Sequence, residues 1–242
     1  MRSIAFICDI HLDEKNPIIF GVDSKKNWER ILKDVRNRNI DEVVFGGDIG
    51  AATAHDYFFN TLKQFKLKLI LGNHDSFLEV SKHYMSGENS TALCYAEKEE
   101  SRKFIYLDSS SKKINKDQLN WLANEINTKR EIAIFIHHPI VKVNTPIDRK
   151  HPLLNRDAAL ELLLQSENNI TIYSGHYHMN HEEQFKNVRQ IITQSSSFQV
   201  VKKAPAMEID ASEFGYRIIS FDKDVIHSKI VTLLNDSKKN KA

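Results

Sequence analysis

Apolar and polar positions along the chain predict short strands separated by helices. Five short runs rich in β-branched and aromatic residues have the length and composition of strands. They span residues 3–8, 41–46, 67–71, 131–136 and 170–174. Longer segments with apolar residues at helical spacing lie between several of them. Strands that alternate with helices are typical of an α/β fold.

The first helical segment has one apolar face. Trp28, Ile31, Leu32 and Val35 lie at positions i, i+3, i+4 and i+7 of that segment. This spacing predicts a helix that packs against a core. Ser24 precedes the pattern, and we expect its hydroxyl to cap the helix.

A second helix is expected around Phe58, Leu62 and Phe65, which repeat the same spacing. Thr53 and Asp56 precede these residues with the T-x-x-D spacing of a capping box. In that motif the two side chains satisfy backbone N–H groups of the first turn. We therefore expect Thr53 to begin this helix.

Two further helices are predicted, one after Asn115 and one over about residues 156–165. Hairpin-like runs are Tyr95 with residues 103–107, residues 189–194, and residues 216–221 with 225–231 around a turn at 222–224. Together these elements predict a four-layer α/β/β/α sandwich, with two mixed sheets packed together and helices outside. We expect one domain over residues 1–235 and a polar, disordered tail over 236–242.

The composition is that of an ordinary globular protein, with 41% hydrophobic and 27% charged residues in 242. Lys and Arg number 34 against 32 Asp and Glu, so the formal net charge is only +2. Such a balance disfavours nucleic acid as a partner.

The cysteine content and the hydropathy bear on the compartment. Cys8 and Cys94 are too few for a disulfide framework, which predicts free thiols and a cytoplasmic location. The apolar run over residues 4–10 is short and interrupted by Asp9, and no run approaches the roughly 20 residues that cross a bilayer. We expect no membrane span and no secretion signal.

Residues that bind metals follow each of the five predicted strands within two or three positions. They are Asp9 and His11, then Asp48, then Asn73 and His74, then His137, then His176 and His178. The carboxyl ends of strands line the ligand crevice of open α/β sheets, so we expect these side chains to meet in one place. Glycines in the same loops, such as Gly72 and Gly175, allow the backbone to turn sharply beside a bound ion.

The type and number of these side chains predict two metal ions. Imidazoles, carboxylates and one amide suit manganese, iron or zinc, whether divalent or trivalent. A single first-row ion is filled by about four to six donors, so seven candidates indicate a pair of ions.

The motifs D-x-H, GGD, GNHD, HHP and GHxH occur in this order between Asp9 and His178. This series resembles the calcineurin-like metallophosphoesterases, and its spacing is most similar to the bacterial class III cyclic-nucleotide phosphodiesterase branch. Ile49, Gly50 and Ala51 follow Asp48, so the metal-binding tyrosine of purple acid phosphatases is missing. The Asp that ends GNHD, in place of Glu, also makes the Ser/Thr protein phosphatases a poorer match.

The resemblance implies a role for each of these residues. One ion would be held by Asp9, His11 and His178, the other by Asn73, His137 and His176, with Asp48 bridging both. His74 would lie just outside the metal shell and protonate the leaving group. Asp75 would accept a hydrogen bond from the ring of His74 and fix its orientation.

The chemistry favours a small phosphoester substrate. Two ions about 3.5–4 Å apart acidify a shared water, so that hydroxide bridging them can attack phosphorus, and they stabilise the negative charge of the transition state. We expect hydrolysis of a phosphodiester, foremost cAMP to its 5′-monophosphate. A glycerophosphodiester, nucleotide sugar or phosphomonoester remains open, as does a non-catalytic binding scaffold, while the sequence does not indicate an oligomeric state.

Three further features near the motifs permit two interpretations each. His138 either orients a neighbouring group or packs in its loop, and His151 either borders the substrate pocket or lies on the surface. The run from Gln194 to Ser197 either lines the pocket or forms a polar loop. Cys8 is expected to be a buried strand thiol.

Overall fold

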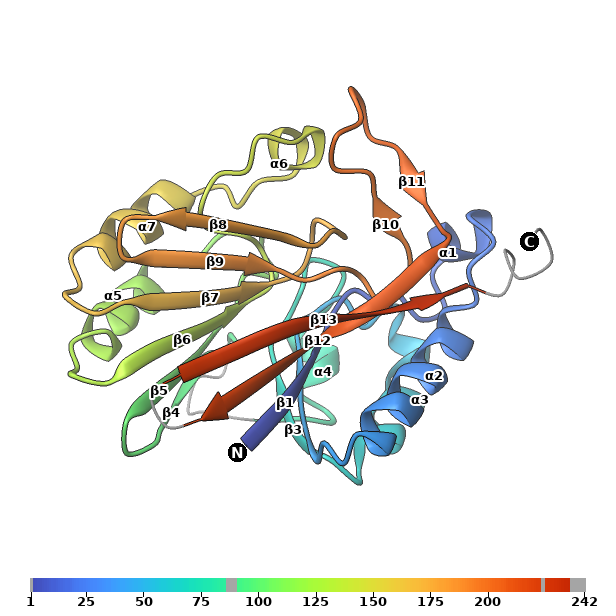
Figure 1. The fold of residues 1–242 in the computed structure, drawn as a ribbon, viewed down its shortest axis with the longest axis horizontal. Helices are drawn as coiled ribbons and strands as arrows, with labels where there is room; N and C mark the ends of the chain where they lie inside the picture. Colours follow the sequence, from blue (N-terminus) through green and yellow to red (C-terminus); the bar gives the residue numbers. More distant parts are fainter. Residues whose placement is uncertain (1, 86–90, 223–224, 236–242) are drawn as a thin grey trace.

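Two β-sheets lie face to face between helices in the computed structural model, which describes residues 2–85, 91–222 and 225–235 (Figure 1). This arrangement confirms the four-layer α/β/β/α sandwich that the sequence predicts. The predicted tail over 236–242 and most of the predicted turn at 222–224 lie outside the described residues.

The first sheet has five strands in the order β13-β12-β1-β2-β3. They are β1 (Arg2–Ile7), β2 (Glu42–Phe45), β3 (Lys66–Leu69), β12 (Glu213–Asp222) and β13 (Val225–Leu234). β1, β2 and β3 are parallel, whereas β12 is antiparallel to β1 and to β13. The chain thus returns at its C-terminal end to pair with its first strand.

The second sheet has six strands in the order β4-β5-β6-β7-β9-β8. They are β4 (Tyr95–Lys98), β5 (Arg102–Leu107), β6 (Glu131–Ile136), β7 (Ile170–Ser174), β8 (His181–Phe185) and β9 (Val188–Ile192). The four central strands are parallel and the two edge strands are antiparallel to their neighbours. A separate two-stranded ribbon consists of β10 (Gln199–Val200) and β11 (Ile209–Asp210).

Helices cover the outer faces of both sheets. The elements are α1 (Lys15–Ile19), α2 (Ser24–Asn37), the 3₁₀ turn η1 (Ala52–Ala54), α3 (His55–Leu62), α4 (Phe77–Val80), α5 (Lys116–Glu125), α6 (Pro146–Lys150) and α7 (Arg156–Leu164). α2 and α3 lie beside the five-stranded sheet, and α5 and α7 beside the six-stranded sheet (Figure 1).

The side chains of β5 alternate between two apolar cores. Phe104 and Tyr106 join the core that packs against the five-stranded sheet, whereas Ile105 and Leu107 join the core beneath α5 and α7. Successive strand residues point to opposite faces of a sheet, so one apolar strand serves both layers. The strands and helices predicted from apolar patterns are confirmed, except that α3 ends at Leu62 and Phe65 packs in the core from the turn that follows it.

The predicted cap at Ser24 is wrong by one residue. Asp23 is the N-cap of α2, and its carboxylate accepts a hydrogen bond from the backbone N–H of Lys26 at 2.9 Å. The hydroxyl of Ser24 instead lies 3.1 Å from that of Ser197. Asp and Ser are both good caps, so the tertiary contact decides which of two adjacent residues caps.

The predicted capping box at Thr53 and Asp56 is also wrong. Thr53 lies inside η1, and α3 begins behind Ala54, whose side chain makes no cap hydrogen bond. The hydroxyl of Thr53 donates to the carboxylate of Asp13 at 3.3 Å instead. A tight turn before the helix therefore replaces the side-chain cap.

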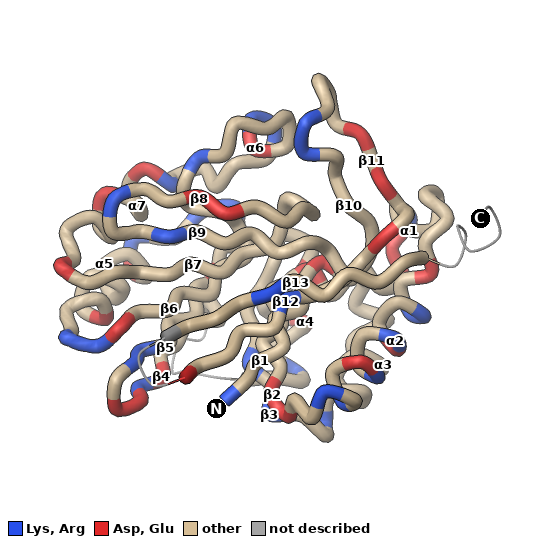
Figure 2. Tube along the Cα trace, viewed as in Figure 1, with Lys and Arg blue, Asp and Glu red and all other residues tan. Residues whose placement is uncertain are grey.

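Charges of both signs are interspersed along the chain, as on α2 and on β8 with β9 (Figure 2). None of the helices in the described part of the chain has the length and apolar character that a membrane span requires.

Candidate metal centre

The loops that follow β1, β2, β3, β6 and β7 meet at one end of the sandwich. The structure brings all seven expected ligand residues together there, as predicted from their positions after the strands. Asp9 and His137 are completely buried. The others line a cavity of about 340 Å³: His11, Asp48, Asn73, His176 and His178.

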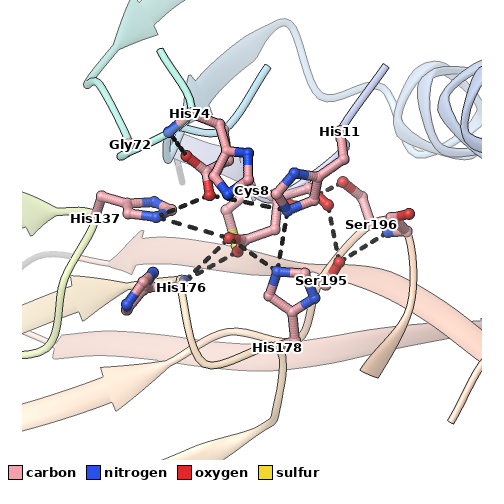
Figure 3. Close-up of polar contacts among 12 residues, drawn as sticks. Cys8, His11, Gly72, His74, His137, His176, His178, Ser195 and Ser196 are labelled. Atoms are coloured by element: carbon pink, nitrogen blue, oxygen red, sulfur yellow. Dashed lines mark hydrogen bonds and ion pairs between the residues drawn. The ribbon is translucent and has the colours of Figure 1, made fainter. Parts of the chain in front are cut away.

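Six of these residues form two clusters suited to a cation. Asp9, His11 and His178 form one cluster, and Asp48, His137 and His176 form the other, with ligand atoms within 4.8 Å of one another in each. In the first, Nε2 of His178 lies 3.4 Å from Oδ1 of Asp9. The rings of His11, His137 and His178 point toward a common centre in Figure 3.

One oxygen of Asp48 faces both clusters. Its Oδ2 lies 3.2 Å from Nε2 of His137 and 3.8 Å from Nε2 of His11. Its Oδ1 accepts a hydrogen bond from the backbone N–H of His74 at 2.8 Å. The carboxylate is therefore held in place on one side and open toward the two clusters on the other.

Each of the four imidazoles is oriented by one ring N–H. Nδ1 of His137 donates to the carbonyl of Gly46 (2.8 Å), Nδ1 of His178 to that of Phe198 (2.9 Å), Nε2 of His176 to that of His151 (2.9 Å), and Nδ1 of His11 to the carboxylate of Glu14 (3.1 Å). A carbonyl or ionised carboxylate can only accept, so in the neutral, metal-binding form of each ring the second nitrogen carries the lone pair that faces the centre.

These lone pairs and one amide oxygen fit a metal ion. Nε2 of His11 and Nε2 of His178 lie 3.1 Å apart, so with both Nδ1 atoms protonated two lone pairs face one another and need a proton or a metal ion between them. Oδ1 of Asn73 and Nε2 of His137 are buried without a hydrogen-bond partner among the described residues. Such atoms are costly unless an unseen group satisfies them.

The electrostatics of the clusters favour ionised carboxylates. Burial opposes the charge on Asp48, but His137 holds the pKa of its carboxyl well below the usual range. Burial also opposes protonation of His137, yet the carboxylates of Asp48 and Asp9 raise its pKa to about 10. Burial and the nearby His137 lower the pKa of His176 to about 3. The site thus presents buried negative charge to a cation.

The backbone is strained at the same residues. Asp9, His11, Asp48, His176 and His178 all have φ between 48° and 67°, the left-handed region that non-glycine residues rarely adopt. Each such residue costs on the order of 1–3 kcal/mol, and this kind of strain clusters at functional sites.

Two glycines leave room for the carboxylates. A Cβ at Gly72 would collide with Oδ1 of Asp48, and a Cβ at Gly175 would lie 2.5 Å from Oδ2 of Asp9. These close approaches agree with the sequence interpretation of glycines beside a bound ion.

His74 lines the cavity with its side chain 39% exposed, but its partner differs from the prediction. Nδ1 of His74 lies 3.0 Å from Oε1 of Glu14, and this hydrogen bond raises the pKa of His74 to about 9. The predicted hydrogen bond between His74 and Asp75 is wrong. The carboxylate of Asp75 instead accepts from the backbone N–H groups of Asp48, Ile49 and Gly72 at 2.7–2.9 Å.

Glu14 is the residue of this site that the sequence did not reveal. It follows no strand and belongs to none of the motifs, so its only signal was a place three residues after His11. Its carboxylate accepts from His11 and from His74. Burial raises the pKa of Glu14, but these two hydrogen bonds outweigh burial and lower it to about 2.

The run from Gln194 to Ser197 is buried and holds the end of β1. Hydroxyls of Ser195 and Ser196 donate to the carbonyls of Asp9 and Cys8 at 2.8 and 2.6 Å (Figure 3). Cys8 is fully buried, as expected, and burial holds the pKa of its thiol well above the usual value.

His138 and His151, which each had two interpretations from the sequence, both contact His176. The ring of His138 is buried, with its centroid 4.1 Å from that of His176, and its Nδ1 lies 2.9 Å from the hydroxyl of Ser109. His151 lines the cavity and orients His176 through its backbone carbonyl. Both residues therefore support the orientation of a predicted ligand.

Among known protein families, residues 2–180 match the family model described as calcineurin-like phosphoesterase. A protein of Xenorhabdus bovienii named probable cyclic nucleotide phosphodiesterase is 28% identical over 243 residues, covering 92% of this chain and 97% of that protein. A protein of Arcobacter nitrofigilis named probable glycerophosphodiester phosphodiesterase is 26% identical over 191 residues, covering 71% and 70%.

Solved structures with similar folds include proteins of different roles. A dimetal phosphatase from Danio rerio superposes with a TM-score of 0.68 at 14% identity, covering 96% of this chain and 98% of that chain. GAP50, described as the anchor in the inner membrane complex of Plasmodium, has a TM-score of 0.66 at 14% identity, covering 96% and 84%. At this identity the likeness shows the fold alone.

Proposed function

Because the chain belongs to the calcineurin-like phosphoesterase family, we propose that it hydrolyses a small phosphodiester, foremost a 3′,5′-cyclic nucleotide such as cAMP. The family makes the chain a metal-dependent phosphoester hydrolase. The organic group of the substrate is inferred from the walls of the cavity and from the names of relatives.

The fold implies a dinuclear centre, and the donors present fit it. We assign one ion to Asp9, His11 and His178 and the other to Asn73, His137 and His176, with Asp48 facing both. Imidazole, carboxylate and amide donors suit manganese, iron or zinc. Bound ions would acidify water and neutralise the phosphate oxygens.

His74 is assigned the transfer of a proton to the departing oxygen. Its Nδ1 is bound to Glu14, which leaves Nε2 for a group in the cavity. When the bond from phosphorus to the departing oxygen breaks, that oxygen takes the proton from Nε2, and water restores it afterwards. Asp75 is assigned a positioning role, since it joins the backbone of the Asp48 loop to that of the Gly72 loop.

The apolar half of the cavity is the observation that favours a cyclic nucleotide. The apolar part of the wall consists of Phe20, Ile147, Phe198, Val200, Met207 and Ile209, and Phe198 packs against the rings of His11 and His178. The rings of Phe20 and Phe198 meet edge to face, with centroids 4.9 Å apart. A flat nucleobase would bury apolar surface against this wall, whereas a glycerol group would leave the wall in water.

Kinetics with a substrate panel test this proposal. The metal-loaded enzyme is assayed with 3′,5′-cAMP, glycerophosphocholine, a nucleotide sugar and p-nitrophenyl phosphate. We expect the highest kcat/KM for cAMP. Faster turnover of glycerophosphocholine or of the monoester would reject the cyclic nucleotide, and inertness toward all four before and after chelation would favour a binding scaffold.

A variant of the apolar wall isolates its contribution. Met207 is 40% exposed on the cavity rim, so Met207→Ser should raise the KM for cAMP several-fold with little effect on glycerophosphocholine. Leu78→Ser removes an apolar side chain that is 70% exposed and not part of this wall, and serves as the control. Equal changes for both substrates would contradict the assignment.

We also propose one domain over residues 1–235 in a cytoplasmic protein. The pairing of β12 with β1 supports a single unit, since it joins the two ends of that range. The free thiols of Cys8 and Cys94 suit a reducing compartment.

A further inference from the structure

Three of the four metal-facing imidazoles are oriented by backbone carbonyls, and His11 is the exception. The carbonyls of Gly46, Phe198 and His151 accept from His137, His178 and His176. His11 donates to a side chain, the carboxylate of Glu14, at 3.1 Å. A charged acceptor forms a stronger hydrogen bond than a carbonyl and makes the imidazole a better ligand.

The same carboxylate also holds His74. Oε2 of Glu14 accepts from His11, and Oε1 lies 3.0 Å from Nδ1 of His74. The ring centroids of His11 and His74 are 4.8 Å apart in an edge-to-face arrangement. One side chain therefore contacts both a predicted metal ligand and the predicted proton donor.

The position of Glu14 favours this use over a helix cap. Glu14 is the N-cap of α1, yet its side chain makes no cap hydrogen bond and lies in the cavity with 16% of its surface exposed. Glutamate is not a preferred N-cap residue, and here both of its carboxylate oxygens contact histidines instead of the helix backbone.

We propose that Glu14 is a positioning residue that uses its two oxygens to fix His11 for metal binding and His74 for proton transfer. The inference rests on the proposed function, because it assumes that His74 serves the departing oxygen. It predicts that removing one carboxylate changes two separable properties, ion affinity and dependence on the leaving group.

A third metal ion held by His11, Glu14 and His74 is the competing explanation, since their ligand atoms also lie within 4.8 Å of one another. A third ion would require Nδ1 of His11 to lose its proton while Nε2 of the same ring binds the ion of the cluster with Asp9 and His178. A neutral imidazole offers one lone pair, so the hydrogen-bonded arrangement is favoured.

Metal titration is the first test. Metal-free Glu14→Ala and wild-type proteins are titrated with Mn²⁺ by calorimetry, and we expect the affinity for one ion to fall about 10–100-fold with two ions still bound. Asp13→Asn is the matched control, because it removes a neighbouring, exposed carboxylate that contacts Thr53 instead. Unchanged affinity in Glu14→Ala, or a third ion bound by the wild type and lost in the variant, would overturn the proposal.

Leaving-group dependence at saturating Mn²⁺ is the second test. For a series of aryl phosphodiesters, the loss of activity in Glu14→Ala should be largest for substrates with basic leaving groups. In a His74→Ala background, adding Glu14→Ala should not increase the leaving-group dependence further. Glu14→Gln has a single acceptor oxygen and should restore one of the two properties, not both. Restoration of both would refute the two-oxygen contact.

The two arms separate this proposal from the proposed function. Calorimetry needs no substrate, so a fall in ion affinity supports the contact with His11 even if the wild type hydrolyses no phosphodiester. Thermal unfolding of the metal-free variants shows that each is folded. A folded Glu14→Ala with normal leaving-group dependence in an active enzyme would refute the contact with His74.

Discussion

Asp75 accepts a hydrogen bond from the backbone N–H of Asp48 at 2.7 Å, and thereby joins the loops after β2 and β3. The same carboxylate accepts from Ile49 and from Gly72, each at 2.9 Å. Within the GNHD motif, the backbone N–H of His74 therefore holds the carboxylate of Asp48, whereas the side chain of His74 reaches the cavity.

Removing the Asp75 carboxylate should destabilise the protein before it affects chemistry. In Asp75→Ala three backbone N–H groups lose their acceptor, and each buried unsatisfied donor costs about 1–3 kcal/mol. We expect the free energy of unfolding of the metal-free protein to fall by about 2 kcal/mol or more, measured with urea. Asp75→Asn keeps one acceptor oxygen, so its free energy of unfolding should lie between those of Asp75→Ala and the wild type. Wild-type stability in Asp75→Ala would contradict this view.

Replacing Asp48 should disturb both metal positions. Its Oδ2 faces the two clusters, so Asp48→Ala should weaken the binding of both ions by more than about 100-fold, beyond the effect of an outer hydrogen-bond partner. Metal analysis after desalting and calorimetry measure the loss. Asp41→Ala removes an exposed carboxylate that pairs with Lys66 and is the control. Retention of two tightly bound ions would refute the shared contact.

Loss of the His74 ring should affect proton transfer alone. With His74→Ala we expect kcat to fall about 10²–10⁴-fold for diesters with basic leaving groups and far less for p-nitrophenyl diesters. The metal content should stay at the wild-type level, because His74 is not among the seven predicted ligands. Equal losses for good and poor leaving groups would show that the ring has another role.

A methyl group at Gly72 should displace Asp48. The new Cβ in Gly72→Ala would overlap Oδ1 of Asp48, so we expect weaker ion binding without any loss of a donor atom. Gly21→Ala provides the control, because nothing lies within 4 Å of its new Cβ, although its φ of 72° also strains an alanine. Wild-type affinity in Gly72→Ala would mean that the loop moves freely.

The predicted strands and ligand loops are confirmed because their signals are local. Four of the five motif-bearing strands are apolar on both faces or nearly so, whereas β3 alternates lysine with leucine. Each of the five is followed by a loop that carries metal-binding residue types. β8 was not predicted, since His181–Phe185 is a polar edge strand without an apolar pattern. Short-range patterns thus identify the buried strands and miss those held only by a neighbour.

The contacts that could not be predicted depend on the path of loops in space. His74 and Asp75 are adjacent in sequence, yet the turn directs one side chain to the cavity and the other to the Asp48 backbone. Glu14 lies 60 positions from His74 and meets it only after β1 and β3 have been placed in one sheet. Spacing in the sequence carries no information about either orientation.

A left-handed backbone limits which residue types are tolerated at five of the predicted ligand positions. These are Asp9, His11, Asp48, His176 and His178. Asp, Asn and His tolerate this conformation better than most side chains, and they are also donors for hard and borderline metals. Glutamate or cysteine could bind an ion at these places but lacks that conformational tolerance. Main-chain shape and coordination chemistry therefore favour the same few residue types, so replacing one of these ligands by glutamate or cysteine would strain the loop as well as change the metal preference.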